Sequence, residues 1–223
     1  MISQVIRFTL PATATISAAA FAELRRHAVT AGALAQYYGY TQQVPNAPMP
    51  RKRHEICWAI NWPRGSDRSI IMEELAAIAA DAMSLDFQFP EGGEFKSVSA
   101  FEAPVCEFAC IRLSDTAPLD DVSLQKSMNK TFADTHKIIG FTGGSWAYAL
   151  NTNDSSGVSV SDIASVLPAG ERRLAVYPLG WESIELHQDG TKTPVFAEEL
   201  DKIGPYFGPG SGAWYVSFKK HSE

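Results

Sequence analysis

The chain has 223 residues with a formal net charge of −6, and 45% of its residues are hydrophobic and 20% charged. These values are typical of a folded chain with a substantial core, and they argue against intrinsic disorder. The acidic balance also argues against a nucleic-acid partner, because phosphate binding needs a concentrated Lys/Arg surface. The basic residues 51–54 stand in a Pro-rich loop, which is interpreted as a solvated loop, with an anion contact as the alternative.

The cysteines and the apolar runs indicate the compartment. Cys106 and Cys110 lie four residues apart in an apolar run, where a strand would point both to one face, and no second metal-type pair exists. We therefore predict no metal site and expect free thiols in a reducing compartment. No apolar run approaches the roughly 18 residues of a membrane span, and the chain starts in a strand-like segment rather than a signal peptide. We expect an intracellular, cytoplasmic protein without a membrane partner.

The first half of the chain predicts two helices among four strands. Residues 5–10 read as a strand ended by Pro11, and residues 17–34 show apolar side chains at helical spacing with Ser17 as the expected N-cap. The segments that follow are an aromatic strand at 36–42, a Pro-rich turn at 46–50, an alternating strand at 54–62, an amphipathic helix at 70–83 and a short strand at 85–89.

The second half repeats this order. The expected segments are a strand at 105–113, a helix at 122–136, a strand-like stretch at 138–150, a polar excursion at 151–169, a strand at 173–179, helical residues at 181–187 and 194–207, and a strand at 214–218. The stretch 138–150 is interrupted at Gly143 and Gly144, where a bulge or a close backbone approach is expected.

Strand-helix-strand-strand-helix-strand is the ferredoxin-like unit, and it occurs twice. We therefore predict an α+β protein with two tandem ferredoxin-like repeats, residues 1–103 and residues 104–223. Apolar side chains crowd both faces of the strands, so each sheet needs a second covering surface besides its helices. The two sheets are expected to pack against each other as an intramolecular dimeric α/β-barrel, which is compatible with a monomer (a pseudo-dimer) or with a homodimer.

Several short motifs carry a family resemblance. They are Tyr37-Tyr38-Gly39, Ile60-Asn61-Trp62, Gly143-Gly144-Ser145-Trp146 and the Gly-Trp-Glu-Ser-Ile-Glu-Leu-His segment at 180–187. Together they resemble the tandem dimeric α/β-barrel proteins of the antibiotic-biosynthesis-monooxygenase-like superfamily, a type common in filamentous fungi. This resemblance implies the fold, and it implies a small-molecule pocket between a sheet and its own two helices. Its members include cofactor-free monooxygenases, cyclases, decarboxylases, dehydratases, haem enzymes and proteins without known activity.

The first repeat supplies the candidate catalytic residues. His27 falls on the same predicted helix stripe as Leu24, so it should point at the sheet, as an acid or base or as a core-edge histidine. Tyr40 and His54 complete the predicted catalytic set. If one repeat keeps a pocket, we expect it to be the first.

Aromatic residues supply the candidate substrate-binding set. These are Tyr38, Trp58 and Trp62 in the first repeat, and Trp146 and Tyr148 in the second. Their rings suit a planar phenolic or polyketide-like ligand, and ordinary barrel packing is the alternative. The Gly-Trp-Glu-Ser segment is interpreted as a structural helix start.

The chain lacks the glycine-rich nucleotide-binding motifs and the standard hydrolase motifs, so we predict no cofactor. The expected function is a cofactor-independent enzyme of secondary metabolism that acts on an aromatic or polyketide-derived small molecule. Acid-base chemistry of the cyclase, dehydratase, decarboxylase or isomerase type comes first, and oxygenation of an electron-rich phenol comes second. The alternative is a non-catalytic small-molecule-binding or stress-responsive barrel protein.

Overall fold

A computed structural model describes residues 1–11, 13–43, 54–89, 99–162 and 166–222 of the chain. The Pro-rich turn at 46–50, the basic residues 51–53 and the turn at 90–93 lie outside the described residues. No helix in the described ranges is long and apolar enough to cross a membrane.

The first repeat forms a four-stranded antiparallel sheet with two helices. Its elements are β1 (Ile2–Thr9), α1 (Ala19–Thr30), β2 (Ala35–Gln43), β3 (Glu55–Trp62), α2 (Ser69–Ile78) and β4 (Met83–Phe87). The strands lie in the order β2-β3-β1-β4, with both strand pairs of β1 antiparallel. This is the predicted ferredoxin-like arrangement.

The second repeat has the same arrangement with a longer middle. Its main elements are β5 (Val105–Arg112), α4 (Val122–Thr135), β6 (Phe141–Gly144), β7 (Ala147–Tyr148), β8 (Val158–Ser159), β9 (Leu174–Trp181), α5 (Ile184–Gly190), α6 (Pro194–Ile203), β10 (Gly212–Val216) and β11 (Lys219–Lys220). The sheet order is β6-β9-β5-β10, and β7 continues beside β9 where β6 stops. The predicted irregularity at Gly143 and Gly144 is confirmed, because the pairing register of β6 with β9 shifts between Phe141 and Gly143.

Two seams join the sheets into a barrel. At one seam β10 pairs with β2, and β11 extends the pairing along β2. At the other, Phe87 at the end of β4 forms an isolated bridge with Ala149, which directly follows β7. The predicted fold, two tandem ferredoxin-like repeats closed into one intramolecular barrel, is confirmed.

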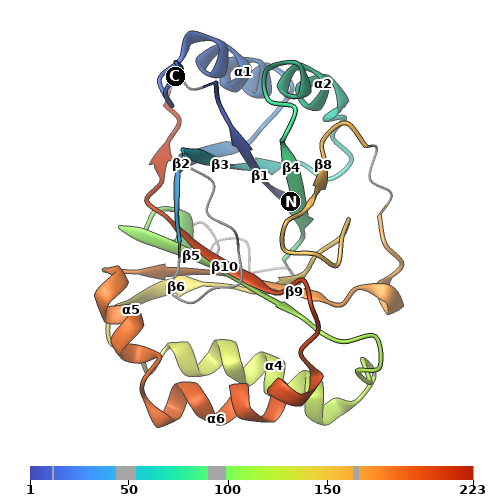
Figure 1. The fold of residues 1–223 in the computed structure, drawn as a ribbon, viewed down its shortest axis with the longest axis vertical. Helices are drawn as coiled ribbons and strands as arrows, with labels where there is room; N and C mark the ends of the chain where they lie inside the picture. The colour runs from blue at the N-terminus through green and yellow to red at the C-terminus, as the bar shows by residue number, and fades with distance from the viewer. Residues whose placement is uncertain (12, 44–53, 90–98, 163–165, 223) are drawn as a thin grey trace.

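The core has three layers. Strand residues that point into the barrel form an inner cluster shared by both repeats, including Val5, Phe87, Phe108 and Trp214. The opposite faces of the strands pack on α1 and α2 in the first repeat, and on the helices of the second repeat in the other. Figure 1 shows α1 and α2 at one end of the molecule and α4, α5 and α6 at the other, with the strands between them.

Several predicted helix boundaries were wrong, including the start of the helix predicted at 181–187, which begins at Ile184, and the end of the helix predicted at 194–207, which ends at Ile203. The first helix starts at Ala19, and its N-cap is Ala18 with no side-chain cap, rather than Ser17. The second helix ends at Ile78, because the chain turns there and Met83 already pairs in β4.

Candidate functional site

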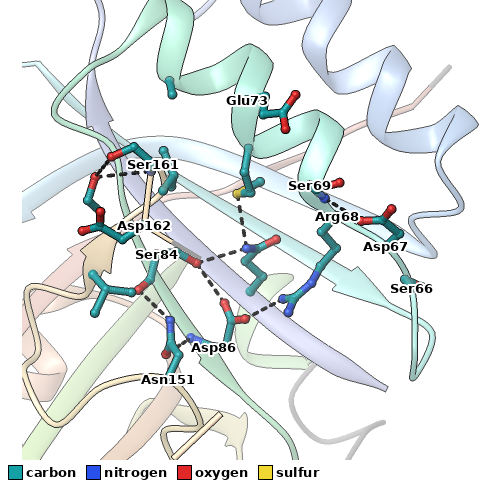
Figure 2. Close-up of a pocket in the computed structure, with 16 residues that line it drawn as sticks. Ser66, Asp67, Arg68, Ser69, Glu73, Ser84, Asp86, Asn151, Ser161 and Asp162 are labelled. Carbon is teal, nitrogen blue, oxygen red and sulfur yellow. Dashed lines mark hydrogen bonds and ion pairs between the residues drawn. The ribbon is translucent and has the colours of Figure 1, made fainter. Parts of the chain in front are cut away.

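A cavity of about 620 Å³ lies on the helix-facing side of the first repeat, between β1, β4 and α2. Its fourth wall comes from the second repeat, from Asn151 and the segment 158–162 that contains β8. The other lining residues are Gln4, Ser66, Asp67, Arg68, Ser69, Met72, Glu73, Ala76, Ser84 and Asp86. Figure 2 shows these side chains around the hollow, with Asp86 on its floor.

The carboxylate of Asp86 is the meeting point of the polar groups. Ser84 Oγ donates to Asp86 Oδ1 at 2.9 Å, and Arg68 Nη1 donates to Asp86 Oδ2 at 2.6 Å. The two side chains of the ion pair retain 25% exposure for Arg68 and 10% for Asp86, so a small molecule in the cavity can reach both. Charge-assisted hydrogen bonds of this kind fix the direction of a carboxylate as well as its position.

A chain of hydrogen-bond donors behind Ser84 sets the orientation of its hydroxyl group. Trp62 Nε1 donates to Gln4 Oε1 at 3.0 Å, and Gln4 Nε2 donates to Ser84 Oγ at 3.0 Å. Because Ser84 Oγ accepts from Gln4, its own proton is directed to Asp86. Every hydrogen bond in this chain therefore points toward the carboxylate, which is held as an acceptor.

The wall from the second repeat is attached at several points. The side chain of Asn151 forms hydrogen bonds with the β4 backbone that a neighbouring strand would otherwise form. It accepts from the Asp86 backbone N–H at 2.9 Å and donates to the Ser84 carbonyl at 3.1 Å. Two further contacts hold the segment: β8 pairs with β4 through Val158 and Ser84, and Arg7 Nη2 donates to the Ser155 carbonyl at 2.8 Å. The first repeat alone would leave this cavity open on one side.

The sequence contained a signal for this site that its analysis missed. Along β1 and β4 the helix-facing positions should be apolar, as Ile6 and Phe8 are, yet Gln4, Ser84 and Asp86 are polar and buried. Buried polar side chains on a core-facing row need partners, and their partners here surround a cavity. Sequence reasoning favoured histidine and aromatic residues instead.

The three predicted catalytic residues lie away from this cavity. The side chain of His27 is 48% exposed, and its Nδ1 lies 2.8 Å from Oε2 of Glu74 on α2, so its expected orientation toward the sheet is wrong. Tyr40 and His54 do come together, with ring centroids 6.3 Å apart, and Tyr40 accepts a hydrogen bond from the Ile16 N–H. No contact between His27 and this pair occurs among the described residues, and a catalytic role for the three stays a prediction.

The predicted aromatic residues of the first repeat belong to the helix–sheet core. Trp58 is fully buried and donates to Gln36 Oε1, and Tyr38 packs edge-on against Phe21. Trp62 is also fully buried, and its link to the site is indirect, through Gln4. Their predicted role in substrate binding stays a prediction.

Trp146 and Tyr148 line a second cavity, of about 490 Å³. It lies where the two repeats meet, with Ile2 and Gln88 contributed by the first repeat. These are the two of the five predicted substrate-binding residues that line a described cavity.

The second repeat contains a counterpart of the network around Asp86. Trp62 and Trp181 occupy matching positions opposite the first residues of β1 and β5, and Trp181 Nε1 donates to Glu107 Oε2 at 3.0 Å. Glu107 therefore corresponds to Gln4. The Asp86 position, opposite Gln4 in the sheet, corresponds to Tyr215, opposite Glu107.

The ion pair has its counterpart as well. Arg68 and His187 each lie six residues beyond their tryptophan, and His187 Nδ1 lies 2.6 Å from the Tyr215 hydroxyl. His187 Nε2 also lies 3.1 Å from Glu107 Oε2. All of these side chains are buried, and none of them lines a described cavity, so this copy of the network is closed.

Burial determines the ionisation of the closed copy. It raises the pKa of Glu107 to about 7, with a smaller opposing effect of the hydrogen bond from Trp181. Burial also lowers the pKa of His187 to about 4. The pair thus favours a neutral imidazole beside a carboxyl group that holds its proton near neutral pH.

The described residues include no group of three or more His, Cys, Asp or Glu side chains placed to hold a metal ion. The chemistry that the open site can supply from its own residues is proton acceptance by Asp86 and charge stabilisation by Arg68.

Comparison with known proteins finds similar solved structures but no similar sequence family. The sequence matches no protein-family model and no curated protein. Among solved structures, a proposed monooxygenase from Lactobacillus acidophilus is similar over 99% of this chain and 95% of its own, with a TM-score of 0.53 and 10% identity. A proposed monooxygenase from Fusobacterium nucleatum is similar over 100% and 94%, with a TM-score of 0.55 and 8% identity.

A proposed chlorite dismutase is similar over 98% of this chain and 94% of its own, with a TM-score of 0.53 and 10% identity. The likeness to all three proteins extends over nearly the full length of each chain, and at such low identity it shows the shared fold alone. The chain therefore has the tandem dimeric α/β-barrel fold, which hosts different chemistries and does not by itself identify one.

Proposed function

We propose that this protein is an enzyme that transfers protons on a small molecule bound in the first-repeat cavity, with Asp86 as the base and Arg68 as the group that stabilises the developing negative charge. The observation that carries the proposal is the convergence of directed hydrogen-bond donors on one accessible carboxylate at the floor of a 620 Å³ cavity. Cavities of this size that contain a few convergent polar groups are the usual form of a small-molecule site.

The step follows from the geometry. Asp86 takes a proton from a carbon next to a substrate carbonyl, so the C–H bond breaks and an O–H bond forms on the carboxyl group. The electron pair moves to the carbonyl oxygen, where the positive charge of Arg68 stabilises the enolate. Return of the proton from Asp86 to another carbon gives isomerisation. Attack of the enolate carbon on a second carbonyl of the same molecule, whose oxygen then takes the proton from Asp86, gives cyclisation. Loss of a β-hydroxyl group, which takes the proton from Asp86 and leaves as water, gives dehydration. The step needs no cofactor.

Two alternatives remain from the sequence. The fold shared with two proposed monooxygenases supports oxygenation of an electron-rich phenol as a second reaction, with molecular oxygen as co-substrate. A barrel that binds the same molecules without turnover is the non-catalytic alternative. The shared fold supports a place among the tandem dimeric α/β-barrel proteins, and the motif resemblance alone supports the antibiotic-biosynthesis-monooxygenase-like type that is common in filamentous fungi.

We also propose a cytoplasmic protein with small-molecule partners, as a monomer or a homodimer. The support is that Cys57, Cys106 and Cys110 are all free and buried, as is common in a reducing compartment.

The test follows deuterium incorporation from D₂O into 1,3-dicarbonyl probes, with acetylacetone first, by proton NMR. Asp86→Asn keeps the size of the side chain and the backbone contacts with Asn151 but removes the base, so exchange should slow by about 10²–10⁴-fold. The matched control is Asp201→Asn, an exposed carboxylate on α6 outside both cavities, which should exchange at the wild-type rate. Equal rates for wild type and Asp86→Asn, or binding of the probes without exchange, would contradict the proposal.

A further inference from the structure

The second cavity differs from the first in its chemistry. Its lining is largely aromatic and apolar, and the one charged residue among its described lining residues is Arg172. The lining residues are Ile2, Gln88, Asn129, Trp146, Ala147, Tyr148, Leu150, Val166 and Arg172. The first cavity instead has carboxylates, hydroxyls and amides around Arg68.

Its aromatic residues are fixed in position. Trp146 stacks on Tyr177 with ring centroids 5.3 Å apart and an interplanar angle of 14°, and Tyr148 packs edge-on against Trp146. Since one face of Trp146 is covered by Tyr177, a ligand ring can stack only against the other face. The Tyr148 hydroxyl accepts from Gln125 Nε2 at 3.1 Å, so its own proton can be donated to a ligand.

The two cavities are neighbours along the same strands. On β1, Gln4 lines the first cavity and Ile2 the second, and at the end of β4, Asp86 lines the first and Gln88 the second. Residues two apart in a strand point to the same face and lie about 7 Å apart. On the facing segment the two cavities are lined by consecutive residues, since Leu150 lines the second cavity and Asn151 lines the first.

The backbone at this boundary is shared by both cavities. The Leu150 N–H donates to the Asp86 carbonyl at 2.7 Å, and the bridge between Phe87 and Ala149 lies directly beside it. The seam that closes the barrel therefore runs along the floor of both cavities.

We propose that the two cavities are two ends of one binding site, and that its ligand is an elongated molecule with a planar aromatic ring against Trp146 and an oxygen-bearing head at Arg68 and Asp86. This inference rests on the proposed function for the head and adds the ring-binding end. Neither cavity alone suits such a molecule, since the first lacks an aromatic wall and the second lacks the carboxylate.

The test uses isothermal titration calorimetry to compare one linked probe, 1-(2-naphthyl)-1,3-butanedione, with two fragments that resemble its halves, acetylacetone and 2-naphthol. Joining two fragments that bind neighbouring places raises affinity through effective concentration, so the linked probe should bind at least 10²-fold more tightly than the better fragment. Trp146→Leu should abolish this gain. Phe207→Ala, which truncates an exposed aromatic residue outside both cavities, should keep the gain.

Because Trp146 packs on Tyr177, Tyr148→Phe provides a milder variant, which keeps the ring and should weaken the binding of 2-naphthol. If both fragments bind together but the linked probe gains nothing, the cavities are separate sites and the inference is overturned, while the proposed function stands. If acetylacetone neither binds nor exchanges, the proposed function falls and the inference falls with it.

Discussion

At the scale of single residues, one matched position distinguishes the open network of the first repeat from the closed network of the second. Gln4 in the first repeat and Glu107 in the second both accept a hydrogen bond from a buried tryptophan at 3.0 Å. The amide has a donor left for Ser84 and so connects to the open site. The carboxyl group instead meets His187, and the two titratable groups are buried together.

Their pKa shifts have opposite effects on stability. The pKa of Glu107 is raised to about 7, so its contribution to stability is present at low pH and is lost as the pH rises through about 7. The pKa of His187 is lowered to about 4, so its contribution is present above about 6.5 and is lost as the pH falls toward about 4. Between about pH 4.5 and 6.5 the effect of Glu107 on stability offsets the effect of His187, and the pair holds one proton in the folded protein.

Glu107→Gln should therefore make the free energy of unfolding decrease as the pH falls. Glutamine is the residue that the first repeat has at this position, and its amide group can keep both hydrogen bonds. Because the amide does not titrate, it no longer offsets the loss of stability that His187 causes as the pH falls. The free energy of unfolding should fall by about 2–3 kcal/mol relative to wild type between pH 6.5 and pH 4, measured by urea denaturation at several pH values. Parallel pH profiles for the variant and wild type would show that the pair does not share a proton.

At the scale of elements, the wall built by β8 depends on a close backbone approach. Gly157 has a φ of +90°, and a Cβ at this position would lie 2.8 Å from the Ser84 carbonyl oxygen. Only glycine combines that conformation with that approach. Asn151 and β8 are then held against β4 as described above, which places the wall over Asp86.

Gly157→Ala should lower stability by about 1–3 kcal/mol and also weaken acetylacetone binding, because the wall must move away from β4. Gly32→Ala is the matched control, since Gly32 has a φ of +96° and nothing within 4 Å of the added Cβ. The control should lower the melting temperature without changing affinity. Unchanged affinity in Gly157→Ala would show that the wall has no part in binding.

The helices show what the sequence could and could not predict. Helical spacing located α1, but the buried residues are Phe21, Leu24, Arg25 and Ala28, so the inward stripe is rotated away from His27. Arg25 faces inward because its guanidinium lies over the rings of Phe21 and Tyr38, at 4.4 and 4.1 Å. An arginine is normally assigned to the surface from sequence, and only the tertiary packing reveals this contact.

At the scale of the whole molecule, the second repeat supplies one wall of the first-repeat cavity, through Asn151 and the segment 158–162. The doubled element order and the two apolar faces of the strands were sufficient to predict the barrel. The predicted excursion at 151–169 gave no sign of its place, because its contacts with Asp86, Ser84 and Arg7 join residues 65 or more positions apart. Such pairings depend on how the sheets close, which a local pattern does not encode.

The most direct test of the account is a crystal structure of the protein with 1-(2-naphthyl)-1,3-butanedione bound. The account predicts density for the two carbonyl oxygens of the ligand at Arg68 and Asp86. The naphthyl ring of the ligand should lie beyond Leu150, against Trp146. A ligand seated beside His27 and Tyr40, or at Trp146 with no contact to Asp86, would contradict the assignment of the active site.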